Sequence, residues 1–184
     1  YAGFLGENGY EEGKAAANFL LKKCSSMDTE RINILELAGT ANSSIAISRA
    51  NGFRDVIKTD RRFSIIHSED GDFLRSRGRE IVDRIIEHNG GLNIDGCPID
   101  VIFSHNDPMT LGLLESLGKN QLEYKPVIIS IDGEQESIDA LKNGKLNCVV
   151  ECNPNLGPVL MNLVQYVAEG RQIPRATYMQ ESVF

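Results

Sequence analysis

Residues 100–117 read DVIFSHNDPMTLGLLESL, and this stretch decides the fold. Its first part, residues 100–104, is a short apolar run typical of a strand that is buried on both faces. Asp107 and Pro108 then favour a helix start, because Asp suits the N-cap and Pro suits the first helical turn. The stretch therefore predicts a buried strand that leads directly into a helix.

The same alternation of strands and helices extends outward in both directions. Further strands are predicted at 32–37, 63–67, 127–131 and 148–151, and helices at 10–23, 43–58, 72–88, 134–141 and 156–169. Strands that alternate with helices of this length indicate βαβ units. The sequence predicts an α/β fold: a three-layer α/β/α sandwich around a mostly parallel sheet of five or six strands.

Helix ends are marked by their own signals. Ser43 or Ser44 suits the N-cap of the second helix, and Asp72 that of the third, while Gly90 and Gly91 suit the third helix's end. After the last helix, residues 176–184 are predicted to form an extended tail.

Composition narrows the classes of function. The chain has 184 residues and a net charge of −7, so it lacks the basic surface that nucleic acids or anionic membranes require. No apolar run approaches the ~20 residues needed to span a bilayer. Because the chain opens at Tyr1 without an initiator Met, we expect it to be a piece of a longer protein.

The four cysteines leave two alternatives open. Cys148 and Cys152 lie on one predicted strand, with Cα atoms about 13 Å apart, too far for a disulfide. Cys24 and Cys97 are expected at the same end of the sheet, and a bridge between them would fit an exported protein. The alternative is four unpaired thiols.

Polar side chains collect in the loops that follow the predicted strands. Ligands of open α/β sheets bind at the carboxyl edge of the sheet, where these loops converge. The loops are rich in amides, carboxylates and hydroxyls, with one aromatic residue, and they occupy residues 38–44, 68–73, 105–107, 132–134 and 152–154. Such a set suits a polyol ligand, which needs many hydrogen bonds and one flat apolar wall.

Signatures of catalysis, cofactors and metals are missing from the sequence. There is no GxSxG, GxxxxGK[ST], strand-linked GxGxxG or HExxH motif, and the three histidines lack metal-ligand spacing. We therefore expect no enzyme, no cofactor and no metal. An enzyme would need a general acid and base at the same edge, where Asp70, Asp72 and Asp132 are the candidates.

An ordered set of short motifs gives the chain a resemblance to a known family. The motifs lie at residues 5–13, 36–40, 48–53, 71–73, 104–107, 131–133, 150–154 and 181–183. With them the chain resembles the sugar-binding proteins of ABC transporters, of the ribose- and galactose-binding type and closest to the galactofuranose-binding branch. The resemblance covers the whole chain and implies a type I periplasmic-binding-protein lobe.

The resemblance also implies a division of the chain. In that family two lobes joined by three crossings enclose the ligand. By this comparison residues 1–152 form the C-terminal ligand-binding lobe, residues 153–175 hold a helix of the missing N-terminal lobe, and residues 176–184 are a returning tail strand.

Ligand contacts follow from the resemblance by position. The expected ligand-binding residues are Arg49, Phe73, Asn106, Asp132, Asn42, Glu151 and Asn153. Of these, Glu151 and Asn153 are alternatives for one polar group at the last crossing.

Each main contact also has a structural alternative. Arg49 could be a solvated helix residue, and Phe73 could fasten its helix to the sheet. Asn106 could cap the following turn, although Asp107 already suits that position, and Asp132 could cap the helix at 134–141. Glu36 lies inside a strand and is expected to be structural.

The resulting hypothesis is reversible binding of a monosaccharide between two lobes, read by the membrane permease of an ABC transporter in the periplasm or outside the cell. No direct nucleic-acid partner is expected, whereas the apolar face of helix 156–169 could support self-association. The rival hypothesis is the effector lobe of a lactose-repressor-type regulator or a sugar sensor.

Overall fold

A five-stranded, fully parallel sheet forms the centre of the protein in the computed structural model, which describes residues 1–120, 122 and 124–184. The strand order is β3-β2-β6-β7-β8. The strands are β2 (Ile32–Ala38), β3 (Phe63–Asp70), β6 (Val101–Ser104), β7 (Val127–Asp132) and β8 (Cys148–Glu151). The expected parallel sheet is thus confirmed.

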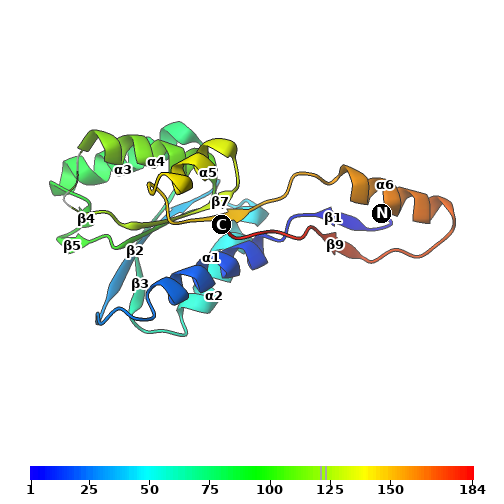
Figure 1. Cartoon of the computed structure of the whole chain (residues 1–184), viewed down its shortest axis with the longest axis horizontal. Helices are drawn as coiled ribbons and strands as arrows, with labels where there is room; N and C mark the ends of the chain where they lie inside the picture. The colour runs from blue at the N-terminus through cyan, green and yellow to red at the C-terminus, as the bar shows by residue number, and fades with distance from the viewer. Residues whose placement is uncertain (121, 123) are drawn as a thin grey trace.

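Helices cover both faces of this sheet. On one face lie α1 (Gly9–Lys23) and α2 (Ser44–Ile57), and on the other lie α3 (Arg75–Asn89), α4 (Asp107–Asn120) and α5 (Gln135–Lys142) (Figure 1). This is the three-layer α/β/α sandwich that the alternating sequence predicts. We call the sheet and these five helices the body.

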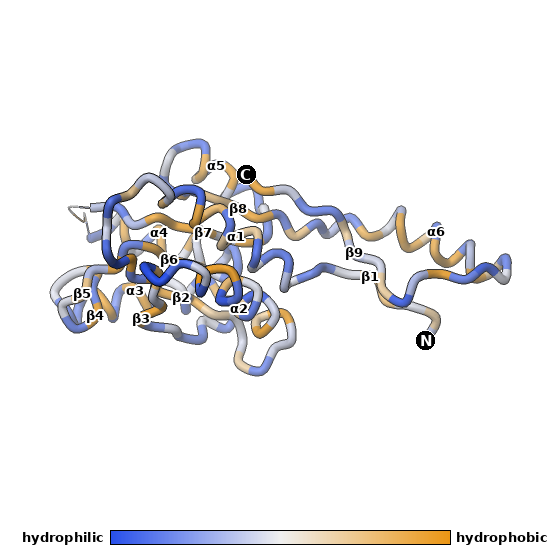
Figure 2. Tube along the Cα trace, turned by 90° about the horizontal axis from the view of Figure 1, so that it is seen from below, coloured by the Kyte–Doolittle hydropathy of each residue, from blue (hydrophilic) through white to orange (hydrophobic). Residues whose placement is uncertain are grey.

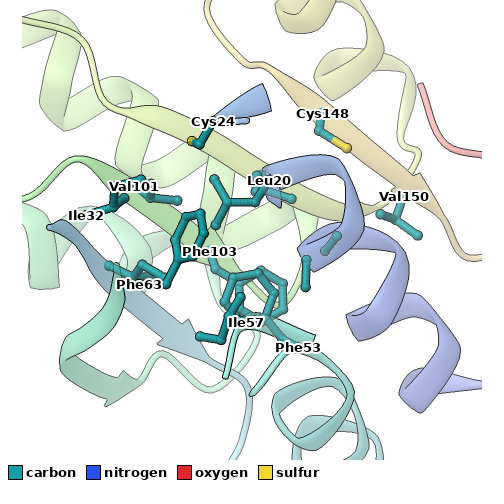
Figure 3. Packing of buried hydrophobic residues seen from close by; sticks show 14 of the residues in the cluster. Leu20, Cys24, Ile32, Phe53, Ile57, Phe63, Val101, Phe103, Cys148 and Val150 are labelled. Atoms are coloured by element: carbon teal, nitrogen blue, oxygen red, sulfur yellow. The ribbon is translucent and has the colours of Figure 1, made fainter. Parts of the chain in front are cut away.

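Alternation along the strands divides the core into two clusters. In β6, Phe103 faces α1 and α2, while its neighbour Ile102 faces the other helix layer. Phe103 stacks on Phe53 of α2 with ring centroids 3.9 Å apart, in the centre of the first cluster (Figure 3). The sheet is therefore apolar on both faces, as buried parallel sheets are.

A close helix crossing positions α2 against α1. A Cβ atom on Gly13 would lie 2.1 Å from the carbonyl oxygen of Arg49, and one on Gly52 would lie 2.0 Å from that of Tyr10. Only glycine allows two helix backbones to approach so closely. The crossing sets Arg49 directly beside the first turns of α1.

Three elements project from the body as an arm. They are β1 (Phe4–Gly6), α6 (Gly157–Ala168) and β9 (Ala176–Tyr178), and β1 pairs with β9 in a parallel two-stranded sheet (Figure 1). None of the residues of α6 is buried. Hydrophobic residues nevertheless recur along this helix, well apart from the body (Figure 2).

The chain crosses between body and arm three times, at residues 7–8, 152–156 and 179–182, which we call the junction. Beyond the junction the tail returns to the body and pairs with the edge of β8. Val149 N donates to the Phe184 carbonyl at 3.0 Å, and Phe184 N donates to the Val149 carbonyl at 2.8 Å. Short antiparallel pairing thus extends the five-stranded sheet.

Several expected element boundaries differ in the structure. Asp72 does not cap the third helix, which begins at Arg75 with Leu74 at the N-cap and no side-chain cap bond. Ser43 holds the N-cap position of α2 but makes no cap bond, while Gly90 ends α3 in the left-handed conformation as predicted. Strand β3 runs to Asp70, so residues 68–70 belong to the strand.

The proposed Cys24–Cys97 disulfide is not formed, since all four cysteines are free. Cys24 is buried in the cluster beneath α1 and α2. Cys97 lies in a short hairpin of β4 (Asn93–Ile94) and β5 (Cys97–Pro98), which packs beside α3 on the opposite face.

Among the described residues, no helix combines the length and the apolar character needed to cross a membrane.

Candidate ligand-binding site

Arg49 lies at the carboxyl edge of the sheet, buried to 4 % exposure between two carboxylates. Its Nε donates to Glu12 Oε2 at 2.6 Å, and its Nη2 donates to Asp132 Oδ1 at 3.3 Å. A third donor, Nη1, binds the carbonyl of His105 at 2.5 Å. Arg49 is thus not the solvated helix residue of the structural alternative, and two of its five N–H groups have no partner among the described residues.

Asp132 follows β7 and has an unusual backbone, with φ at 136°. Burial raises the pKa of its carboxyl to about 7, against the opposing charge of Arg49. A carboxyl that titrates near neutral pH can both accept and donate hydrogen bonds. Asp132 makes no cap bond to α5, whose N-cap is Glu134, so the alternative role as helix cap is excluded.

A hydrogen bond from the Asn106 side chain to the backbone carbonyl of Phe73 joins these two residues. Asn106 Nδ2 donates to the carbonyl of Phe73 at 3.2 Å, and Asn106 Oδ1 accepts from Met109 N at 3.1 Å. The second bond caps α4, the position that sequence reasoning gave to Asp107. Asn106 therefore has both the cap role and a place at the edge beside Phe73.

The ring of Phe73 rests on Gly39, after β2. A Cβ atom on Gly39 would lie 2.0 Å from the ring's Cζ atom, so only glycine leaves the space that the ring occupies. Asp72 and Phe73 both have left-handed backbones, with φ of 54° and 59°. This strained turn aims the half-buried ring across the loop that follows β2.

Asp107 binds the neighbouring loop instead of capping its own helix. The fully buried carboxylate accepts from the hydroxyl of Ser130 and from the backbone N–H groups of Gly133 and Glu134, the latter two at 2.8 and 2.6 Å. These bonds hold the loop that carries Asp132. The cause of the wrong cap assignment is that two adjacent residues, Asn106 and Asp107, can each cap a helix.

His105 and Glu36 form a buried polar network below the edge. Gly39 N donates to His105 Nδ1 at 3.2 Å, which leaves His105 Nε2 as the donor to Glu36 Oε1, also at 3.2 Å. Ser68 and Arg54 also donate to Glu36. Burial favours the neutral acid, but these donors outweigh it and hold the pKa of Glu36 below its ordinary value. Glu36 is structural, as expected.

The three other expected ligand-binding residues, Glu151, Asn153 and Asn42, form no hydrogen bond with Arg49 among the described residues. Glu151 pairs with Asp132 in the sheet register, but its Oε2 accepts from Ser182 N of the tail at 3.0 Å. Asn153 Oδ1 accepts from Asn155 N at 2.9 Å in a local turn. Asn42 is exposed in the loop after β2, with a left-handed φ of 64°.

Glu12 is a site residue that sequence reasoning missed. It is fully buried on α1 and is the closest carboxylate to Arg49. The sequence did carry a signal for its burial. Glu12 precedes Ala16 by four residues and Leu20 by eight, so it lies in the buried stripe of the helix. An acidic residue in such a stripe needs a buried cation as a partner.

One set of side chains within the described residues could share a metal ion. The ligand atoms of Glu12, Cys152 and Glu181 lie within 4.8 Å of one another. Burial raises the pKa of the Cys152 thiol to about 12, which disfavours the thiolate that a metal requires. Arg49 already supplies a cation to Glu12. The set therefore fits a proton better than a metal ion.

The edge as a whole offers charged and neutral hydrogen-bonding groups beside one aromatic face. A parallel α/β sandwich with such groups at the carboxyl edge of its sheet is the architecture of a small-molecule-binding domain. The chain belongs to the family described as periplasmic binding protein domain, whose model matches residues 1–172. The family consists of non-enzymatic binding proteins, so the expectation that the chain is not an enzyme is confirmed.

Named relatives and solved structures agree with this family. The chain is 33% identical over 177 residues to the galactofuranose-binding protein YtfQ of Escherichia coli, covering 94% of this chain and 53% of the relative. It is 27% identical to the ribose import binding protein RbsB of Haemophilus influenzae, covering 78% and 44% of the two chains. A crystal structure from Mycobacterium smegmatis in complex with β-D-fucofuranose matches with a TM-score of 0.87 and 33% identity, over 100% of this chain and 59% of that one.

The chain spans about half the length of the curated relatives it matches.

Proposed function

We propose that this chain is one lobe of a two-lobed sugar-binding protein of an ABC transporter, and that it binds a furanose-like monosaccharide such as galactofuranose. The observation that carries the proposal is Arg49, held between Glu12 and Asp132 at the carboxyl edge of the sheet. A guanidinium fixed by two carboxylates keeps its remaining N–H groups in place for adjacent hydroxyls. Names of relatives that bind galactofuranose and import ribose support the same ligand class.

The other ligand contacts are assigned by their place at this edge. Phe73 supplies the flat apolar wall, and Asn106 supplies an amide beside it. Asn42 and one of Glu151 or Asn153 border the same edge in the loops after β2 and β8.

The arm belongs, on this proposal, to the second lobe. The division that the resemblance implied, residues 1–152, 153–175 and 176–184, needs one change, because β1 (Phe4–Gly6) pairs with β9 in the arm. The ligand-binding lobe then begins at residue 7 and ends at residue 152, residues 153–175 carry α6 of the other lobe, and residues 176–184 contain β9 before the tail returns. The absence of buried residues in α6 and the isolated β1–β9 pair support this division, because both are surfaces that a further layer would cover.

The whole protein acts by closing two lobes on the sugar, and the closed form is recognised by a membrane permease in the periplasm or outside the cell. Closure is a hinge transition that draws on contacts available only when both lobes engage the ligand. One lobe supplies about half of those contacts, so we expect this chain to bind sugar with a Kd of about 1 mM or weaker.

An amide NMR titration of this chain tests the proposal, with methyl galactofuranoside, galactose, ribose and arabinose at millimolar concentrations. We expect shifts clustered at Asn42, Phe73, Asn106 and Asp132, largest for a furanose. Phe73→Ala should abolish them, whereas Phe4→Ala, which removes an exposed aromatic ring from the arm, should leave them unchanged.

Micromolar binding by this lobe alone would contradict the two-lobe mechanism. If none of the four sugars causes a shift, or if the shifts lie away from the carboxyl edge, the assigned site is wrong.

A further inference from the structure

The junction brings together two carboxyl groups from distant parts of the chain. Glu12 lies in the first half of α1, and Glu181 lies in the third crossing, residues 179–182. Their carboxyl oxygens approach within 4.8 Å of each other. The pair therefore links the body to the segment that returns from the arm.

Both carboxyl groups have an oxygen without a hydrogen-bond partner. Glu12 Oε1 and Glu181 Oε1 are buried and unpaired among the described residues, while Glu12 Oε2 accepts from Arg49. Two ionised carboxylates at this separation repel each other, and a buried acceptor without a donor is costly. A proton on one of the two carboxyl groups removes the repulsion between the charges and turns one of the two acceptors into a donor.

We propose that Glu12 and Glu181 share one proton, and that this carboxyl pair is a latch that fastens the tail to α1 and holds Glu12 against Arg49. Glu181 is then a positioning residue for Arg49 that acts through Glu12. The latch stands on the geometry of the junction alone, whereas its effect on sugar binding rests on the proposed function.

The electrostatic surroundings agree with a neutral acid at Glu181. Burial and the adjacent Glu12 carboxylate raise the pKa of Glu181 to about 8, against the weaker opposing effects of the Asn8 backbone and Arg49. The charged or titratable groups that surround the pair come from four segments of the chain: Glu7, Arg49, Asp132 and Cys152.

A shared proton makes the junction sensitive to pH in the neutral and alkaline range. The pKa of Glu181 is higher in the folded chain than its ordinary value of 4.5. Its contribution to stability is therefore complete below that ordinary value and is lost as the pH rises through about 8. Deprotonation places two negative charges together and loosens the tail, which is bonded to the body at Glu151 and Val149.

The direct test is a carbon-13 NMR titration of the Glu181 carboxyl in this chain, in the presence of EDTA. We expect a midpoint near pH 8 and a parallel rise in hydrogen exchange at the amides of Val149 and Phe184. A midpoint below about pH 5, close to that of a free glutamate, would overturn the proposal.

Thermal unfolding between about pH 6 and about pH 9 gives the second test. We expect the midpoint of the wild-type chain to fall by about 5 °C or more as the pH rises. Glu181→Gln, which replaces the shared proton by a permanent N–H donor, should fall by less than half as much. Its residual slope comes from Asp132 and from the buried thiols, whose pKa values burial also raises.

Matched variants separate the latch from a general charge effect. Glu169→Gln removes one exposed carboxylate near the end of α6 and should keep the wild-type profile. Glu181→Ala should be less stable than the wild type near pH 6, because it leaves Glu12 Oε1 without a donor, and this difference should shrink as the pH rises through about 8 and the wild-type latch is lost. Equal pH profiles for the wild type and Glu181→Gln would contradict the latch.

Adding Zn²⁺ tests whether the cluster of Glu12, Cys152 and Glu181 holds a proton or a metal ion. If stoichiometric Zn²⁺ stabilises the chain and Cys152→Ser removes that effect, the cluster holds a metal and the proton latch is wrong. Since neither titration contains sugar, their outcome is independent of the sugar titration. If the chain binds sugar but the pH titrations show no latch, only the latch is wrong. If the titrations show the latch but no sugar binds, only the proposed function is wrong.

Discussion

At the scale of single residues, buried polar groups define what the carboxyl edge of this sheet can do. Sequence reasoning placed Arg49 and Asp132 there, and the structure joins them by a direct ion pair. The sequence did not predict that Glu12 would pair with Arg49, or that Glu181 would lie beside Glu12. A carboxylate's partner depends on which segments meet in space, and these two residues lie 169 positions apart in the chain.

The neighbouring residues Asn106 and Asp107 show a second limit. Both side chains suit a helix N-cap, and the local sequence does not rank them. The deciding factor is a distant loop: Gly133 and Glu134 present backbone donors to Asp107, so Asn106 takes the cap.

The protonation state of His105 is a testable consequence of its two partners. Burial lowers the pKa of the imidazole, against the opposing effect of Glu36, and the bond from Gly39 N leaves the proton on Nε2. We expect nitrogen-15 NMR to show a neutral Nε2–H tautomer at pH 6, with exposed His88 as the reference in the same spectrum.

The sign of the associated stability change follows from the same shift. The folded-state pKa of His105 lies below its ordinary value of 6.5, so its contribution to stability is present above that pH and is lost as the pH falls. An imidazolium spectrum for His105 at neutral pH would contradict the network with Glu36.

At the scale of elements, periodicity predicted most of the body because both of its patterns are strong. Buried strands are continuous apolar runs, and each covering helix has an apolar stripe. The start of α3 was wrong because Asp72 resembles an N-cap, whereas the chain there makes a left-handed turn that places Phe73. The two-residue strands β4 and β5 are too short to produce a pattern, and β1 depends on pairing with β9.

The crossing of α1 and α2 predicts a large effect from one methyl group. Gly13→Ala should destabilise the chain by about 2 kcal/mol or more, because its Cβ atom would collide with the carbonyl of Arg49 and force the helices apart. Urea unfolding measures the change.

Gly118→Ala is the matched control within α4. A Cβ atom there meets nothing within 4 Å, so the helix preference of alanine should raise stability by about 0.5–1 kcal/mol. Equal effects of the two substitutions would mean that the close crossing does not limit the packing of these helices.

At the scale of the whole molecule, the arm exposes apolar side chains along a helix in which no residue is buried. Four side chains of α6 are at least 44 % exposed: Leu160, Met161, Val164 and Val167. We expect this chain to self-associate through α6 and to sediment as a dimer or larger species, because such a surface is stabilised by being covered.

A double substitution tests that expectation. Met161→Glu with Val164→Lys should shift the sedimentation profile to monomer, whereas Ile47→Glu, an equally exposed apolar residue on the body, should not. A wild-type chain that sediments as a monomer at all concentrations would show that the face stays uncovered.

The pairing of the last residues with β8 has a consequence for how this molecule avoids aggregation. β8 is the terminal strand of the sheet, and an unpaired strand edge is a template for a strand from another chain. Val149 and Phe184 exchange two backbone bonds there, so the tail occupies the edge from within. Conditions that loosen the tail would open this edge to strands from other molecules, and sheets could then join from copy to copy.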